Sequence, residues 1–200
     1  MQRLAELPTL VVTQQKEWGE VLTGFETVNR YAISDTEGRG HFTAAEEAGS
    51  FLLRNFLKSA RPFKIHVIDD QGEAILRIER PFRLFFYEVG IYDAAGTLQG
   101  TVKRQFSLLR RRFKVFDTAG QEVYELFGPL LHPWTFHIRK DGMEIGKITK
   151  KWSGLLTEAF TDADHFGIVF PETCDLPHRA TLLGAVFLID FAYFERTGDH

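Results

Sequence analysis

The sequence contains very little cysteine, and this scarcity limits its chemistry. Cys174 is the only cysteine among 200 residues, which excludes an intramolecular disulfide and any zinc site built from several cysteines. A single thiol suits a reducing compartment. At the N-terminus, Glu6 and Pro8 interrupt the apolar residues before the apolar segment of a signal peptide could form. We therefore expect a cytoplasmic protein.

A strong net charge is also missing. The formal charge of −3 and the pI near 6.2 offer no overall attraction for nucleic acid or anionic membranes, so an electrostatic partner would need a local patch. Motifs of covalent catalysis are absent as well, since the sequence has no Walker loop, no G-x-S-x-G, no H-E-x-x-H and no G-x-G-x-x-G. We expect neither an enzyme nor a nucleic-acid-binding protein.

The longest apolar run is too short to cross a membrane. It reads "ATLLGAVFLIDFAYF", covers 15 residues from Ala180 to Phe194 and includes Asp190. A helix of this length spans roughly 22 Å, whereas the hydrocarbon core of a bilayer is about 30 Å thick. We expect a helix buried inside the protein. Asp190 should then find a polar partner, because an unpaired buried carboxylate is costly.

A turn pattern of Asp, two further residues and Gly recurs after apolar alternating runs. It starts at Asp35, Asp69, Asp93 and Asp117, and "HIRKDG" closes the series. Asp at the start and Gly at the end are typical of tight turns, so each unit predicts strand, turn and strand. We count about twelve strands and predict a mainly β fold, a closed antiparallel barrel around the buried C-terminal helix. Residues 1–200 would form one domain, with 1–27 as a segment that could be peripheral.

Basic side chains gather in "VKRQFSLLRRRFK". Six of them fall within twelve residues: Lys103, Arg104, Arg110, Arg111, Arg112 and Lys114. On two adjacent strands they would form a lipid-binding patch for anionic head groups, worth about 1 kcal/mol per charge near an anionic surface. The alternative is a solvated hairpin, because basic residues also protect exposed strand edges.

The stretch "FTDADHFGIVFPET", Phe160 to Thr173, begins like a calcium-binding loop and ends like a strand. Asp162 and Asp164 occupy the first and third positions of such a loop, but the fifth is Phe166, which has no side-chain oxygen. We predict a turn followed by a strand over "FGIVFP". A low-affinity Ca²⁺ site of Asp162, Asp164 and Glu172 could overlie it. The alternative is that both aspartates only cap the turn.

Three stretches resemble the phospholipid scramblases. "GKITKKWSGLLTEAFTDADHFGIVFP", Gly146 to Pro171, followed by "GAVFLIDFAYFE", Gly184 to Glu195, is similar to the C-terminal half of that family. "RPFKIHVIDDQGEAILRIERPFR", Arg61 to Arg83, matches an earlier block in type and order, and the resemblance covers Asn29 to Gly198. It implies the fold of the Tubby C-terminal domain, which is related to the LURP-one-related proteins and consists of a twelve-stranded barrel around a hydrophobic helix.

The same resemblance implies calcium-stimulated, ATP-independent, bidirectional movement of phospholipids between leaflets, with binding of anionic lipids. The calcium-binding segment of the family falls on residues 162–173, with its final acidic position lost. Eukaryotic relatives carry palmitoylated cysteine clusters where this chain has "FLLRNFLK", with Phe51, Leu52, Phe56 and Leu57. These four side chains could contact the membrane without modification, or they could pack in the core.

We therefore expect a membrane-associated scramblase-family protein whose partners are anionic phospholipids and the membrane surface. It would be peripheral at the cytoplasmic face of the plasma membrane, or cytoplasmic. The alternative is a non-catalytic, Tubby-like module that binds lipid or tethers to a membrane. A third interpretation is a soluble regulatory protein that binds another protein through its apolar loop.

Overall fold

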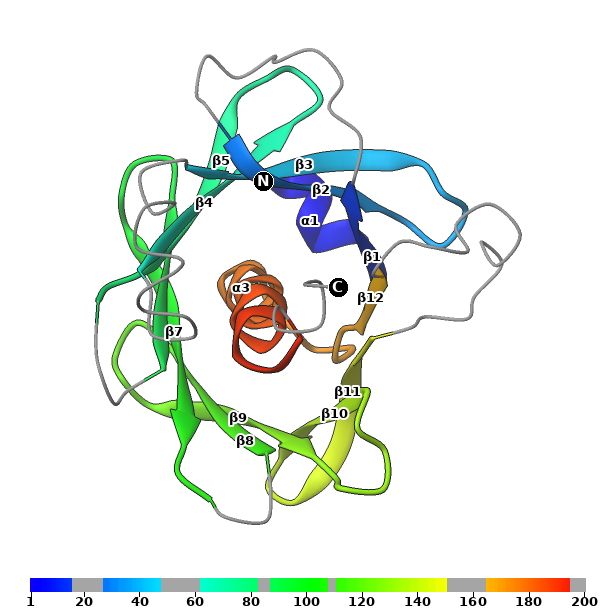
Figure 1. Cartoon of the computed structure of the whole chain (residues 1–200), viewed down its shortest axis with the longest axis vertical. Coiled ribbons are helices and arrows are strands. Elements are labelled where there is room, and N and C mark those ends of the chain that lie inside the picture. The colour runs from blue at the N-terminus through cyan, green and yellow to red at the C-terminus, as the bar shows by residue number, and fades with distance from the viewer. Residues whose placement is uncertain (16–26, 48–61, 83–86, 108–110, 151–164, 195–200) are drawn as a thin grey trace.

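A computed structural model describes residues 1–15, 27–47, 62–82, 87–107, 111–150 and 165–194. In these residues twelve strands form a closed antiparallel barrel around a long helix (Figure 1). The elements are α1 (Gln2–Glu6), β1 (Thr9–Gln15), β2 (Thr27–Ser34), β3 (Gly40–Glu47), β4 (Phe63–Asp69), β5 (Ala74–Arg80), β6 (Glu88–Asp93), β7 (Leu98–Gln105), β8 (Arg111–Phe116), β9 (Glu122–Gly128), β10 (Thr135–Lys140), β11 (Met143–Lys150), β12 (His165–Val169) and α3 (Leu176–Tyr193). The predicted fold class is confirmed.

The strand order follows the sequence around the whole barrel. Each strand pairs with its neighbours in the chain, and β1 closes the barrel by pairing with β12, where Leu10 lies opposite Ile168. Among the twelve described strands, closure leaves no sheet edge open for pairing with another chain. The strand predicted over "FGIVFP" is confirmed as β12. Of the segment 1–27, residues 1–15 and Thr27 are described: residues 1–15 contain α1 and β1, and Thr27 begins β2.

The even-numbered strands β2 to β10 finish at one end of the barrel, in tight turns; we call this the hairpin end. In each of the four Asp-x-x-Gly turns, the carboxylate of the Asp that begins the turn accepts hydrogen bonds from two backbone N–H groups at 2.8 to 3.0 Å. The closing glycines have φ between 77° and 83°, a region that favours glycine. The turns predicted from the repeat are therefore confirmed.

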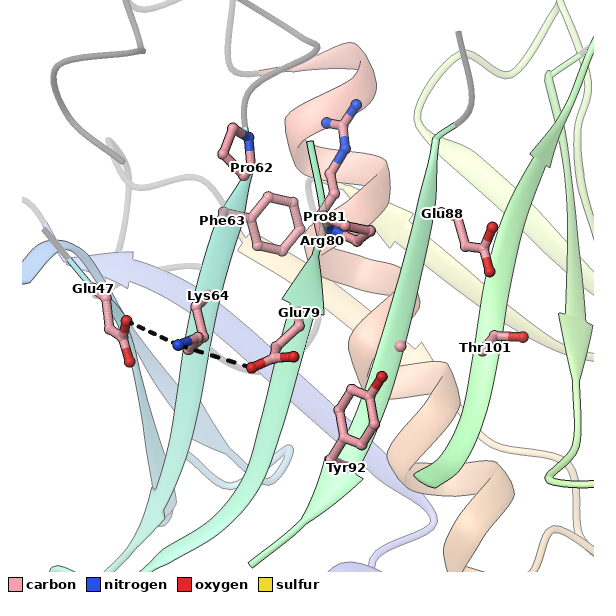
Figure 2. A pocket seen from close by; sticks show the side chains of 11 residues that line it. Glu47, Pro62, Phe63, Lys64, Glu79, Arg80, Pro81, Glu88, Tyr92 and Thr101 are labelled. Carbon is pink, nitrogen blue, oxygen red and sulfur yellow. Dashed lines mark ion pairs between the residues drawn. The ribbon is translucent and has the colours of Figure 1, made fainter. Parts of the chain in front are cut away.

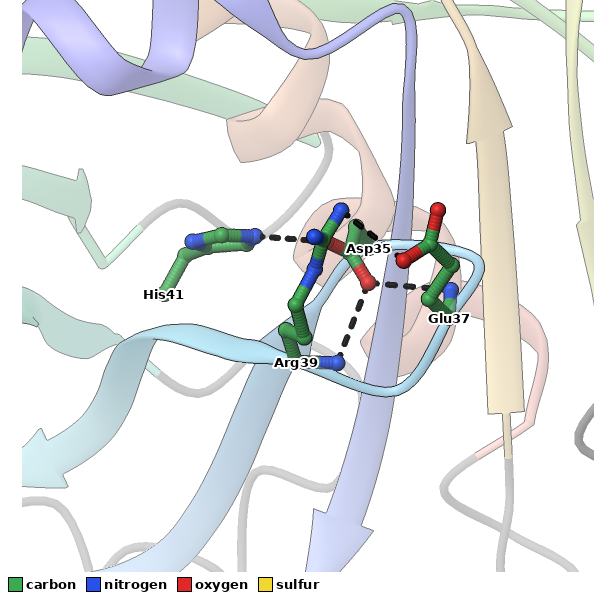
Figure 3. A network of polar contacts seen from close by, with 4 residues as sticks. All are labelled: Asp35, Glu37, Arg39 and His41. Carbon is green, nitrogen blue, oxygen red and sulfur yellow. Dashed lines mark hydrogen bonds and ion pairs between the residues drawn. The ribbon is translucent and has the colours of Figure 1, made fainter.

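Asp35 differs from the other turn aspartates because it is buried. Its Oδ2 accepts a hydrogen bond from Arg39 Nε at 2.7 Å and lies 3.0 Å from His41 Nε2 (Figure 3). Burial alone would raise the pKa of Asp35, but the hydrogen bonds from His41, Arg39 and the backbone outweigh it and hold the pKa well below its ordinary value of 3.8. The β2–β3 turn is thus fixed by side chains as well as by its backbone.

Helix α3 fills the barrel. Asp175 caps its first turn by accepting the His178 N–H at 2.9 Å, and every residue from Arg179 to Phe191 is buried. The helix approaches β6 and β7 closely: a Cβ on Gly184 would lie 2.5 Å from Ile91 Cγ1 of β6, and a Cβ on Gly100 of β7 would clash with Thr181 Oγ1. The buried-helix prediction is confirmed. Among the described residues, no helix has the length and apolar character needed to cross a membrane.

Candidate functional site

The odd-numbered strands β1 to β11 finish at the opposite end of the barrel, which we call the loop end. Most of the exposed large apolar side chains of the described residues lie beside these strand ends: Phe82, Phe106, Leu130, Leu131 and Trp134. Phe106 is 93% exposed and Leu131 is 90% exposed. Met143 is the exception, since it begins β11 at the hairpin end. Apolar groups gathered on one surface indicate a contact with an apolar partner.

Four basic side chains surround the C-terminal end of α3 at the loop end. They continue the inward-facing rows of their strands: Arg80 on β5, Arg104 on β7, Arg111 on β8 and Lys150 on β11. Arg80 is 2% exposed and Lys150 is 5% exposed. The free carbonyl groups at a helix C-terminus carry partial negative charge, which favours cations at this position.

Aromatic rings separate the guanidinium groups of the three arginines. Arg104 lies 4.9 Å from the ring centres of both Tyr87 and Tyr193. Arg80 lies over Tyr87 at 4.4 Å, and Arg111 lies over Tyr193 at 5.5 Å. Burial lowers the pKa of Arg111 and raises the pKa of Tyr193, although a guanidinium group stays charged in proteins. The arrangement holds positive charge next to the exposed apolar residues.

Arg111 also fixes the segment that carries two of the exposed leucines. Its guanidinium group donates to the carbonyl oxygens of Pro129 at 3.1 Å and His132 at 3.2 Å, and also to that of Pro133. Leu130 and Leu131 lie between these acceptors in the sequence. We call the four basic side chains Arg80, Arg104, Arg111 and Lys150 the basic ring. Through Arg111 this ring is joined to the segment that carries the exposed apolar residues Leu130 and Leu131.

Asp190 has the polar partners that its burial required. Tyr31 donates to its carboxylate at 3.3 Å, and Lys150 Nζ lies 3.9 Å from the same carboxylate. Lys150 also lies 4.3 Å from the Phe194 ring, which stacks on Trp134 at 5.4 Å. These contacts join the end of α3 to the barrel wall at the loop end.

The basic cluster predicted from the sequence is divided by the barrel wall. Arg104 and Arg111 face inward, whereas three others form ion pairs on the outer wall: Lys103 with Glu88 at 3.2 Å, Arg112 with Glu125 at 3.4 Å and Lys114 with Glu122 at 2.6 Å. Arg110 lies outside the described residues. The alternation of side chains along a strand causes the division, because neighbouring residues point to opposite faces.

Sequence reasoning missed Arg80, Lys150, Tyr87, Tyr193 and Trp134 as parts of this end. A signal for the first two exists in the sequence. Arg80 comes two residues after the buried Ile78, and Lys150 comes two residues after the buried Ile148. The same period-two count places both side chains on the inner face.

The other predicted site residues are only partly described. Asp162 and Asp164 lie outside the described residues, as do the membrane-contact candidates Phe51, Leu52, Phe56 and Leu57. Glu172 is exposed and follows the hairpin end of β12, whereas His165, the residue next to Asp164, begins β12 at the loop end. The five residues of β12 span roughly 16 Å. Within the described ranges, no three His, Cys, Asp or Glu residues are grouped to hold a metal ion.

Comparison with known proteins gives one family. The family model described as Scramblase matches residues 1–196. Mouse phospholipid scramblase 1 is 37% identical, with 100% of this chain aligned to 65% of its length, and human phospholipid scramblase 1 is 35% identical over 99% of this chain and 66% of its own. The chain thus spans just under two thirds of the length of these relatives.

A solved structure supports the Tubby-like fold. The X-ray structure of a protein from Arabidopsis thaliana has a TM-score of 0.51 at 14% identity and covers 92% of this chain and 91% of its own. At this identity the likeness concerns the fold alone. The sequence relatives carry the assignment, and on them the chain belongs to the phospholipid scramblase family.

Proposed function

We propose that this protein docks on anionic membranes through the loop end and assists ATP-independent, bidirectional movement of phospholipids between leaflets. The observation that carries the proposal is the coincidence of two features at one end of the barrel. Exposed apolar side chains, Phe106 and Leu131 foremost, lie beside the inward-facing basic ring. The proposed location is the cytoplasmic face of the plasma membrane.

The exposed apolar side chains and the basic side chains make separate contributions to the free energy of membrane binding. Moving a Phe or Leu side chain from water into an apolar phase contributes about 1.5–3 kcal/mol. A basic residue near an anionic surface contributes about 1 kcal/mol. Arg104 and Arg111 are half-buried, so phosphate groups would have to approach them at the rim of the barrel. No covalent step is required, because the barrier to lipid movement is the desolvation of the head group.

Co-sedimentation with phosphatidylglycerol-containing vesicles tests the docking. The double substitution F106D/L131D should weaken binding by more than about ten-fold, because it removes two apolar groups from the interface. M143D is the matched control, since Met143 is 67% exposed at the hairpin end, and it should bind like the wild type. Equal losses in both variants would show that the loop end is not the docking surface.

Fluorescent-lipid flip in reconstituted vesicles tests the movement of lipid. Transport of lipid to the opposite leaflet would support the proposal. Loss of that transport in F106D/L131D would indicate that the lipid movement depends on the loop end. One observation favours the alternative of a tethering module: the apolar side chains of α3 pack inside the barrel and are not presented to lipid. Binding without flip would support that alternative, and absence of both would support a soluble regulatory protein.

Calcium stimulation belongs to the same proposal, with Asp162 and Asp164 as its ligands. The family resemblance of residues 162–173 supports it. Lipid flip should be measured with calcium and with a chelator in the wild type, D162A/D164A and E172A. The double variant should lose the calcium response. E172A should keep it, because Glu172 follows the hairpin end of β12 while His165, the neighbour of Asp164 in the sequence, begins β12 at the loop end. An unchanged response in D162A/D164A would exclude this site.

A further inference from the structure

A groove of about 570 Å³ lies on the outer wall of the barrel over strands β3 to β7 (Figure 2). Cavities of roughly 300–1,000 Å³ are typical of small-molecule sites. Its floor is Gly90 of β6, which pairs with Glu79 of β5 and Thr101 of β7. A Cβ on Gly90 would lie 2.9 Å from the Tyr92 hydroxyl. The absence of a side chain at Gly90 therefore leaves room for the Tyr92 ring, which lies across this position in the groove.

The polar lining of the groove alternates in charge. Lys64 lies 3.4 Å from Glu47 and 3.9 Å from Glu79, and these three form one row (Figure 2). On the other side of Gly90, Glu88 forms an ion pair with Lys103 at 3.2 Å. Arg80 also lines the groove, and Arg77 lies 2.8 Å from Glu79. A lining that carries charges of both signs suits a ligand that also carries both.

The apolar part of the lining lies toward the loop end. Pro62 before β4 and Pro81 after β5 border the groove there, together with the edge of the buried Phe63, and the 50% exposed Phe82 follows in the chain. Glu88 begins β6 at the level of Pro81, two residues beyond the Glu79–Gly90 pair. A ligand in this groove would therefore have its polar part between Gly90 and Glu88, with its apolar part passing Pro62 and Pro81 toward the proposed membrane-docking surface. A phospholipid has this division of character.

We propose that the groove over Gly90 binds a phospholipid head group that contains both a phosphate and an ammonium group. Lys64 binds the phosphate, the carboxylates of Glu79 and Glu88 bind the ammonium group, and the acyl chains extend past Pro62 and Pro81 toward the loop end. The direction of the acyl chains rests on the proposed docking. The head-group contacts depend only on the groove.

Binding of short-chain lipids below their micelle concentration tests the groove without a membrane. The full chain should bind dihexanoyl phosphatidylethanolamine at least about ten-fold more tightly than dihexanoyl phosphatidylglycerol, as measured by calorimetry, because only the first supplies an ammonium group. E79Q/E88Q should lose this preference. E125Q is the matched control: Glu125 is 27% exposed and paired with Arg112, much as Glu88 is 22% exposed and paired with Lys103. It should keep the preference.

Three results would overturn the assignment. These are equal affinity of the wild type for the two lipids, loss of the preference in E125Q as well, and equally tight binding of glycerophosphoethanolamine, which would identify a soluble ligand instead of a lipid. The outcome is separate from that of the docking experiment, because phosphatidylglycerol vesicles contain no amine. If the protein does not bind those vesicles but binds the amine lipid more tightly, the result would support the groove assignment and contradict the docking proposal.

Discussion

At the hairpin end, tight turns join successive strands and the Asp carboxylates accept the backbone N–H groups of those turns. At the loop end, the strand ends lie beside exposed apolar residues and the basic ring. Backbone groups that are already hydrogen-bonded contribute little to the binding of a partner. Exposed apolar area contributes more, because its removal from water is favourable by about 25 cal/mol per Å². The first end is built for stability, and the second is available for binding.

Helix α3 connects the two ends, so breaking it should have the largest effect. Substitution G184L would force a side chain into the space of Ile91 and should destabilise the protein by about 3 kcal/mol. Urea denaturation measures the change. G40A is the control, because a Cβ there meets no atom within 4 Å, and it should stay within about 0.5 kcal/mol of the wild type. A stable G184L protein would mean that α3 does not pack against β6 as described.

The next largest effect should come from Asp35 at the hairpin end. D35N removes the charge that Arg39 and His41 contact and should cost about 2 kcal/mol at pH 7, with no effect on vesicle binding. D69N is the control, since Asp69 caps an equivalent exposed turn through backbone N–H groups. Its cost should be smaller. Equal costs in the two variants would show that the buried network adds nothing to the turn.

The pH dependence of the Asp35 contribution has a definite sign. The pKa of Asp35 is lowered in the folded protein, so its stabilising contribution is complete above the ordinary pKa of 3.8 and is lost as the pH falls further toward the folded pKa. The difference in unfolding free energy between wild type and D35N should therefore shrink below that pH. Urea midpoints between pH 3 and pH 6 measure it. A difference that grows on acidification would contradict the assignment.

Local sequence patterns were sufficient to predict the hairpin end but not the loop end. The Asp-x-x-Gly repeat encodes each turn within a few residues, and the apolar run before Phe194 predicts the central helix. The basic ring depends on alternation continued to the last residue of a strand, where charged residues such as Arg80 are ordinarily expected to face water. The groove over Gly90 depends on the register of three strands, which no single segment specifies.

Neutralising one cation of the basic ring should have a smaller effect. R104Q should weaken binding to anionic vesicles by about five-fold, which corresponds to about 1 kcal/mol for one charge at an anionic surface. R104K keeps the charge while losing the flat contact with Tyr87 and Tyr193, so it should restore most of the binding. If R104K binds as weakly as R104Q, Arg104 acts through packing and not through charge.

The smallest effect should come from the outer-wall half of the basic cluster. Lys114 is 37% exposed and paired with Glu122, which is 41% exposed, and such surface pairs contribute about 0–1 kcal/mol. K114Q should therefore change neither the unfolding free energy nor vesicle binding beyond the error of the two measurements. The comparison with R104Q is direct, because both residues belong to the same run of basic sequence and differ in the face of the wall on which they lie. Equal losses of vesicle binding in K114Q and R104Q would mean that net positive charge in this hairpin, and not its placement at the loop end, determines membrane attraction.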